Sequence, residues 1–249
     1  MPIVRGKGAG VSATMPLKQS SRGGSGSFLV MADDGLEYWC KALNNPQSPR
    51  VPVNEQIVAR LGQHIGASVT EPMLVRLDGI VGWEYRPGHT VEPGWAHGCR
   101  ALKAPIETNS ITDHRTEDNN RVRQAGFYAL MDWMHGADQQ WLKDTQAENA
   151  YYSHDHGHFF PSGPNWDAAA LAAAGTTACS FSQPADELDA TEFERLAAAI
   201  ATTALEDIEA VMSKIPAAWP VSDQELSALA AFIDARRGPV AARLRALVP

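Results

Sequence analysis

A lysine on an expected strand and a glutamate on the next expected helix could form a phosphate-binding pair. Lys41 lies in the apolar run 36–43, and Glu55 lies in the first turn of a helix expected from Pro52. Taken alone, Lys41 is a solvated or snorkelling side chain, and Glu55 is a carboxylate favoured by the helix dipole. Taken together, they are a lysine that can hold phosphates and a carboxylate that can orient it.

Asp155 lies in the segment 153–157, which reads SHDHG. The neighbouring His154, His156 and His158 raise the alternative of a metal-dependent hydrolase. Alternation along a strand directs His154 and His156 away from Asp155, and no HExxH or CxxC motif completes a zinc site. Because magnesium prefers a carboxylate with substrate phosphates and water, we expect Asp155 to be a magnesium ligand on a tight turn.

A glycine and serine cluster over residues 20–27 leads directly into a predicted β-hairpin. The hairpin is expected from the apolar runs 28–31 and 36–43 around a turn signal at 33–35. By composition alone the cluster is a flexible linker, but before a hairpin it is suited to lie over phosphates. The expected nucleotide-binding residues are Gly23, Gly24, Ser25, Gly26 and Ser27, together with Lys41 and Glu55.

Asp138 follows an expected helix over 117–135, where a turn aspartate and a catalytic aspartate are equally good interpretations. The order of features is more informative: glycine loop, strand lysine, helix glutamate, hinge, helix and two aspartates. This order is typical of a kinase-like phosphotransferase. Loop amides and Lys41 would hold the ATP phosphates, Asp155 would hold magnesium, and Asp138 would orient or deprotonate the attacking hydroxyl.

The elements needed to position these residues predict an α+β fold with two lobes, of the protein-kinase-like type. Residues 1–87 are expected to form a small β-rich, nucleotide-binding lobe, in which 1–22 are partly flexible. Residues 88–249 are expected to form a mainly helical lobe that carries the catalytic and metal-binding loops, after a Pro/Gly-rich hinge at 86–94. The expected strands after the hairpin are 69–77 and 80–85, and the expected helices are 52–66, 117–135, 166–175, 190–214 and 223–247, the last with a Ser222–Glu225 capping box.

The composition excludes several classes of protein. A hydrophobic share of 44% with 20% charged residues is that of a globular chain, and the net charge of -8 argues against a general nucleic-acid binder. Cys40, Cys99 and Cys179 form no CxxC pair, which suits a reducing cytosol. We expect a cytoplasmic protein without membrane partners, since neither a secretory signal nor an apolar stretch of ~20 residues is visible.

From about residue 23 to residue 247 the sequence resembles the HipA-like kinases, in particular the compact bacterial branch that lacks the toxin's longer N-terminal segment. The pieces that carry the resemblance are Lys41 with the NPQ segment 45–47, Asn54 with Glu55, segment 153–157, and the tail segments 215–219 and 234–237. The resemblance implies a kinase-like fold, ATP and magnesium as cofactors, and transfer of the γ-phosphoryl group to a hydroxyl. In the toxin branch that hydroxyl belongs to a protein Ser or Thr.

The second magnesium ligand departs from the family pattern. HipA-like kinases usually have an asparagine five residues after the catalytic aspartate, and Lys143 occupies that position here. Asp144, Gln140 and Asn149 are the possible replacements. We favour Asp144 because it is a carboxylate.

The adenine side of the expected pocket also departs from the pattern. Protein kinases usually keep a small residue two positions before the strand lysine, and this chain has Trp39. The indole either stacks on adenine or fills the pocket. The Asp-Arg dipeptide of the family is absent too, since Gln139 follows Asp138.

Two functions remain open at this point. The first is an active kinase whose acceptor is a hydroxyl of a protein or of a small molecule. The second is a nucleotide-binding pseudokinase that acts as a regulatory or binding module, motivated by Lys143 and Trp39. The acidic net charge suits a cationic acceptor, but overall charge does not locate a site.

Overall fold

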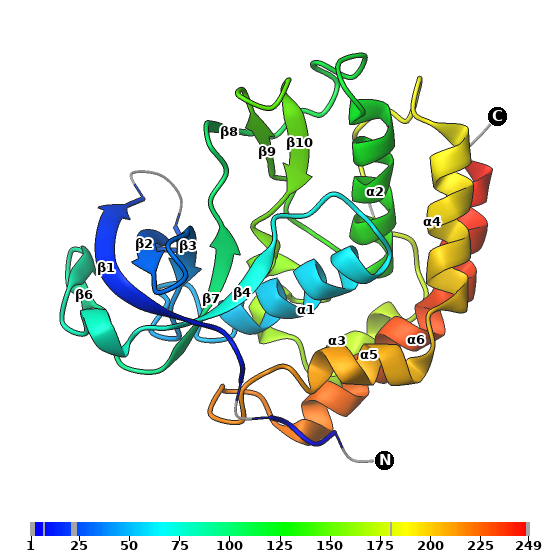
Figure 1. Ribbon diagram of the computed structural model, residues 1–249. Coiled ribbons are helices and arrows are strands. Elements are labelled where there is room, and N and C mark those ends of the chain that lie inside the picture. Colours follow the sequence, from blue (N-terminus) through cyan, green and yellow to red (C-terminus); the bar gives the residue numbers. More distant parts are fainter. Residues whose placement is uncertain (1–2, 7, 21–23, 180, 248–249) are drawn as a thin grey trace.

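A closed β-barrel forms the first part of the molecule (Figure 1). The computed structural model describes residues 3–6, 8–20, 24–179 and 181–247. The strands follow the order β1-β2-β3-β7-β4 around the barrel. Their bounds are β1 Val11–Gln19, β2 Phe28–Ala32, β3 Glu37–Lys41, β4 Pro72–Arg76 and β7 Trp95–Arg100.

The predicted hairpin is present as β2 and β3, which pair antiparallel from Phe28 with Cys40 to Met31 with Glu37. Its turn is set by Gly35, whose φ of 78° lies in the left-handed region that glycine adopts without strain. The Asp34 carboxylate accepts a hydrogen bond from the Leu36 amide at 3.0 Å and closes the turn. Local sequence therefore encodes this hairpin.

Strand β1 corrects the expectation that the chain before residue 23 is weakly structured. It pairs antiparallel with β2 and parallel with β4, and so closes the barrel. Ala13 is its one fully buried side chain, so the strand has little of the apolar alternation that marks strands in a sequence. Gly10 permits the approach to β4, since a Cβ there would lie 1.9 Å from the Leu74 carbonyl oxygen.

The Pro/Gly-rich stretch at 86–94 does not separate two lobes as the sequence predicts. It carries the small hairpin of β5 (Glu84–Arg86) and β6 (His89–Thr90), after which the chain returns to the barrel as β7. Strand β7 pairs with both β3 and β4, so the expected boundary at 87/88 falls inside the barrel segment. The chain leaves the barrel after Arg100.

Helix α1 (Val51–His64) packs beside the barrel (Figure 1). A three-stranded sheet of β8 (Pro105–Thr108), β9 (Trp141–Asp144) and β10 (Ala150–Ser153) faces the barrel from the other side of a cleft. The further helices are α2 Asn120–Trp133, α3 Ala168–Ala174, α4 Ala190–Thr202, α5 Leu205–Met212 and α6 Asp223–Ala246. Among the residues that the structure describes, no helix is both long and apolar enough to cross a membrane.

The helix expected over 190–214 is two helices, because the chain turns at Thr203. The Thr203 backbone is extended, and the Asp207 carboxylate accepts the Ala204 amide at 3.0 Å to begin α5. The Arg237 guanidinium of α6 donates a hydrogen bond to the Thr203 carbonyl at 2.5 Å. The two residues lie far apart in the sequence, so this contact forms only in the folded chain. The Ser222–Glu225 capping box that begins α6 is present as predicted.

A buried guanidinium joins α2, α6 and the loop after α3. Arg236 is 0% exposed and donates to the carbonyl oxygens of Trp133, Asp132, Gly175 and Thr177 at 3.1, 2.6, 2.6 and 3.0 Å. These carbonyls lie at the ends of two helices and in the loop that follows one of them, where backbone acceptors lack partners within a helix. Arg236 therefore ties these ends together.

Replacing Arg236 with Met should lower the free energy of unfolding by about 3–5 kcal/mol, because the carbonyls and the Asp132 carboxylate lose a buried cationic partner. Urea unfolding followed by circular dichroism measures the change. Arg245→Met is the matched control, since Arg245 pairs with Glu194 on the surface and should change the midpoint little. Equal midpoints for the two variants would contradict the structural role of Arg236.

Candidate functional site

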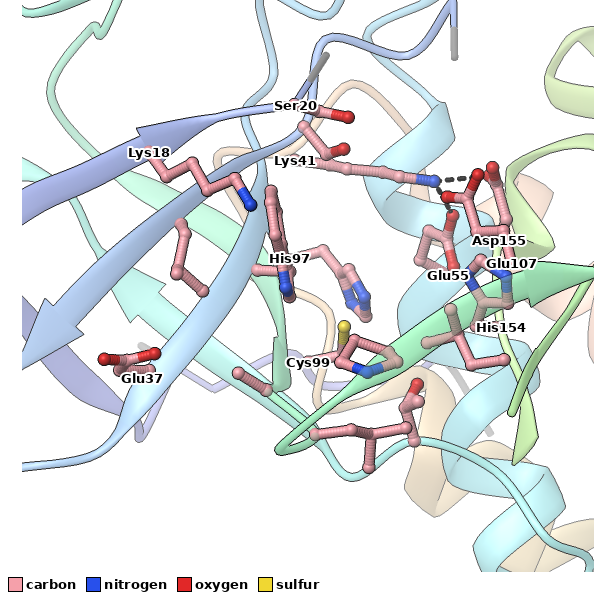
Figure 2. Close-up of a pocket in the computed structure, with 18 of the residues that line it drawn as sticks. Lys18, Ser20, Glu37, Lys41, Glu55, His97, Cys99, Glu107, His154 and Asp155 are labelled. Atoms are coloured by element: carbon pink, nitrogen blue, oxygen red, sulfur yellow. Dashed lines mark hydrogen bonds and ion pairs between the residues drawn. The ribbon is translucent and has the colours of Figure 1, made fainter. Parts of the chain in front are cut away.

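A cleft of about 710 Å³ lies between the barrel and the three-stranded sheet (Figure 2). The barrel contributes side chains from β1, β2, β3 and β7, and the opposite wall comes from β8, β9 and the turn after β10. Glu37, Trp39 and Lys41, which alternate along β3, all line it. The volume is in the range of small-molecule sites.

Lys41 Nζ lies at one end of this cleft between two carboxylates. It forms ion pairs with Glu55 of α1 and with Asp155 Oδ1, the latter at 2.5 Å (Figure 2). Lys41 is 8% exposed and Glu55 is 2% exposed. The structure thus brings together three of the four residues that the sequence singles out for chemistry.

The Glu55 carboxylate is held from both sides. Besides Lys41, it accepts hydrogen bonds from the amides of His156 at 2.9 Å and Gly157 at 3.1 Å. Those amides point back at α1 because Asp155 adopts a left-handed conformation with φ 55°. Glu55 therefore orients the lysine and the aspartate turn at the same time.

The pairing opposes the cost of burial for both partners. Burial by itself would lower the pKa of Lys41, but the Asp155 and Glu55 carboxylates raise it above its ordinary value. Burial would raise the pKa of Glu55, but the Lys41 charge outweighs it and lowers that pKa. Both groups are therefore charged across the physiological pH range.

The glycine loop lies beside this end of the barrel and is held by the segment 44–47. Asn45 Nδ2 donates to the Ser25 carbonyl at 2.6 Å, and Gly26, with φ 57°, packs against Pro46. The Ser20 amide donates to the Ser27 carbonyl at 2.9 Å, which joins the end of β1 to the residue before β2. Ser27 lines the cleft, Gly24 is exposed and Ser25 is buried, and Gly23 lies outside the described residues.

Asp138 lies in the loop between α2 and β9, and its Oδ2 accepts a hydrogen bond from Gln140 Nε2 at 3.0 Å. It is not among the described residues that line the cleft with Lys41 and Asp155. Its neighbours Ala137 and Gln139 line a second cavity, of about 640 Å³. The catalytic role of Asp138 stays a prediction.

The carboxylate of Asp144 is directed at the backbone and not at the cleft. It is 4% exposed and accepts hydrogen bonds from the amides of Lys103, Ala104 and Gln146 at 3.2, 3.2 and 3.0 Å. These bonds tie the linker 101–104 to the turn after β9. The contacts therefore give Asp144 a structural role and do not support the expectation that it binds magnesium.

The other two candidates for the same ligand are also engaged elsewhere: Gln140 Nε2 donates to Asp138 Oδ2 at 3.0 Å, and Asn149 Nδ2 donates to Glu117 Oε2 at 2.6 Å. Lys143, at the position of the family's asparagine, has its Nζ 2.9 Å from His114 Nε2. No three His, Cys, Asp or Glu side chains within the described ranges are arranged to hold a metal, which includes the three histidines around Asp155. Magnesium needs only one or two carboxylates when a phosphate ligand completes its shell.

Several cleft residues carry no sequence signal that would have identified them. His97 and Cys99 come from β7, which was predicted as part of no strand, and Leu102 comes from the linker that follows. No hydrogen bond is formed by the Leu102 backbone N–H or carbonyl within the described chain. Trp39 is half-buried with Lys18 Nζ 5.9 Å from its ring centre, so its indole forms part of the cleft wall.

The comparisons with known proteins give a likeness of fold. No protein-family model and no curated protein matches the sequence. Among solved structures, the chain is similar to the crystal structure of a Helicobacter pylori proinflammatory kinase, CtkA, with a TM-score of 0.62 and 12% sequence identity. The match covers 97% of this chain and 99% of that chain, so the whole mixed α+β architecture resembles that of a kinase.

Stability should fall as the pH drops below about 6.5, the ordinary value for histidine, because His97 is buried. Burial lowers the pKa of His97 to about 3, so in this pH range His97 binds a proton in the unfolded chain but not in the folded chain. From pH 7.5 to pH 5.5 this one group should remove about 1.4 kcal/mol of unfolding free energy. Urea titrations at both pH values measure the loss, and His97→Phe should reduce it by that amount. An unchanged difference in the variant would show that His97 is not the source.

Proposed function

We propose that the protein is an ATP- and magnesium-dependent phosphotransferase of the HipA-like kinase type, which moves the γ-phosphoryl group to a hydroxyl. The observation that carries this proposal is the buried Lys41, bonded to both Glu55 and Asp155 at one end of a nucleotide-sized cleft. The fold likeness to a kinase supports it. The acceptor hydroxyl belongs to a protein Ser or Thr or to a small molecule.

The cleft offers complementary groups to the phosphates and to the base of ATP. Lys41 supplies a charged donor for the phosphates, and Ser27 presents the edge of the glycine loop beside it. The free N–H and carbonyl of Leu102 can pair with the donor and acceptor of the adenine edge. In this arrangement Trp39 and Leu29 provide apolar walls for the base.

The donor chemistry at Asp155 fits a magnesium ion. Its side chain is 21% exposed, so one carboxylate edge is accessible beside Lys41. A bound magnesium ion would neutralise the phosphate charge that develops during transfer. Asp155 is the residue proposed to hold it, and the nucleotide phosphates and water would supply the other oxygens.

The residues of the chain would then act mainly by positioning. Lys41 holds the phosphates in line, and Glu55 keeps Lys41 in place. The acceptor oxygen bonds to the γ-phosphorus as the bond to the β-phosphate oxygen breaks, and ADP leaves. Asp138 accepts the proton of the acceptor hydroxyl, with its orientation set by Gln140.

A pseudokinase is the second candidate, and a specific observation favours it. Neither Lys143 nor Asp144 lines the cleft, and among the described residues Asp138 does not line it either. The nucleotide-binding half of the site is therefore more complete than the catalytic half. In that case the protein would bind nucleotide and act as a regulatory or binding module.

The cysteines agree with the proposed cytoplasmic location. Cys40 and Cys99 are free thiols. Burial raises the pKa of Cys99 to about 12 and that of Cys179 to about 11, so neither is a reactive thiolate. A reducing compartment would keep them in this state.

Incubation of the purified protein with γ-labelled ATP and magnesium should transfer label to the protein itself or to a co-purifying acceptor. Asp138→Asn should lower the rate at least ~100-fold, which is the usual contribution of a positioned general base. Asp138→Asn should still bind nucleotide, whereas Lys41→Met should lose both activities. Equal labelling by wild type and Asp138→Asn would remove Asp138 from the mechanism.

Thermal or chemical unfolding with ATP and magnesium separates the two candidate functions from a scaffold with a filled pocket. Nucleotide at ~100 times its Kd should raise the free energy of unfolding by about 2.7 kcal/mol. A shift without phosphoryl transfer would favour the pseudokinase. No shift would overturn both and would favour a scaffold with a filled pocket.

A further inference from the structure

His97 lies in the middle of the cleft, on the barrel strand next to Lys41. Its Cα pairs with that of Lys41 across β7 and β3, and its side chain is directed into the same cleft. Figure 2 shows its ring between Cys99 and the cluster formed by Lys41 and Glu55. The ring therefore separates the phosphate end of the cleft from the linker end.

The amide of Gln56 determines which nitrogen of His97 carries the proton. Gln56 Oε1 accepts Arg60 Nε at 2.8 Å, and Gln56 Nε2 donates to the Met73 carbonyl at 2.6 Å. The reversed amide would set oxygen against that carbonyl and nitrogen against that guanidinium, so the orientation is unambiguous. The second hydrogen of Gln56 Nε2 is then available for His97 Nδ1, 3.1 Å away.

His97 Nδ1 is consequently an acceptor, and the proton of the neutral ring lies on Nε2. Burial lowers the pKa of His97 to about 3, so the ring stays neutral under physiological conditions. Within the described chain Nε2 has no hydrogen-bond partner. It is also absent from the fully buried polar atoms that lack a partner, so Nε2 is not fully buried. The cleft thus contains a neutral N–H donor held by the chain of contacts from Arg60 through Gln56.

The position of this donor selects the ligand atom. In an anti purine nucleotide the N7 edge of the base lies on the same side as the 5′-phosphates. Adenine N7 is an uncharged acceptor, whereas the adjacent exocyclic amine is a donor. If Lys41 holds the phosphates and Leu102 the outer base edge, the base acceptor nearest the lysine strand is N7.

We propose that His97 Nε2–H donates a hydrogen bond to purine N7 of the bound nucleotide, with Gln56 as the positioning residue that holds the ring in this tautomer. The inference rests on the proposed nucleotide-binding function and adds base recognition to it. Pyrimidine nucleotides have no N7, so they should bind more weakly because they lack this hydrogen bond.

The first test reads the tautomer directly. In protein labelled with ¹⁵N-histidine, long-range proton–nitrogen correlation spectra at pH 7 should show His97 with Nε2 protonated and Nδ1 unprotonated. MgATP should shift the Nε2 signals much more than those of Nδ1. A Nδ1–H tautomer, an imidazolium, or Nε2 signals unmoved by saturating MgATP would overturn the proposal.

The second test removes one partner at a time, with Kd measured by calorimetry. Wild type should bind ATP about tenfold more tightly than 7-deaza-ATP, as expected for one hydrogen bond. His97→Phe should bind the two nucleotides equally. Gln56→Met removes the contact to Nδ1 but leaves the imidazole. This variant should bind ATP less tightly than wild type, and its Kd values for ATP and 7-deaza-ATP should differ by less than tenfold.

The outcomes separate this proposal from the proposed function. Equal Kd values of wild type for ATP and 7-deaza-ATP would overturn the role of His97 and leave the kinase proposal standing. Failure to bind either nucleotide would overturn both. If His97→Phe does not fold, the wild-type ratio and the spectra still decide the matter.

Discussion

The buried ammonium of Lys41 is the interaction on which the cleft depends. An isolated charge removed from water costs several kcal/mol, so Lys41 is tolerated there only because carboxylates meet it. Glu55 reaches it from α1 and Asp155 from the turn after β10. One ion-pair network therefore fixes the positions of the barrel, a helix and the sheet on the far side of the cleft.

This network also sets the charge of the candidate site. Two carboxylates face one ammonium, and the amides of His156 and Gly157 offset part of the charge on Glu55. The remaining negative charge is concentrated at Asp155, which is the more exposed of the two carboxylates. Under the proposed function, a cation with phosphate ligands would suit such a place better than a second fixed ammonium, since it would arrive and leave with the nucleotide.

Part of the fold and of the site could be predicted from the sequence because the signals are local. Alternation and a DG turn define β2 and β3, and Pro52 and the apolar stripe define α1, so Lys41 and Glu55 were placed on the correct elements. Strand β1 was missed because most of its side chains face solvent, and its stability comes from backbone pairing to two neighbours. Strand β7 was missed because Pro and Gly before it resemble a hinge.

The sequence by itself determined the residue types, their order, and the elements that carry Lys41, Glu55 and Asp155. The tertiary structure alone decided what each carboxylate and imidazole does. Asp144 and Asp155 are the same residue type, yet their roles differ. Asp144 accepts hydrogen bonds from the amides of the linker and has a structural role, whereas Asp155 forms an ion pair with Lys41. His97 becomes a donor in the cleft only because Gln56 and Arg60, far away in sequence, lie beside it. The physical reason is that a polar side chain takes its role from its partners, and these partners are brought together only by packing.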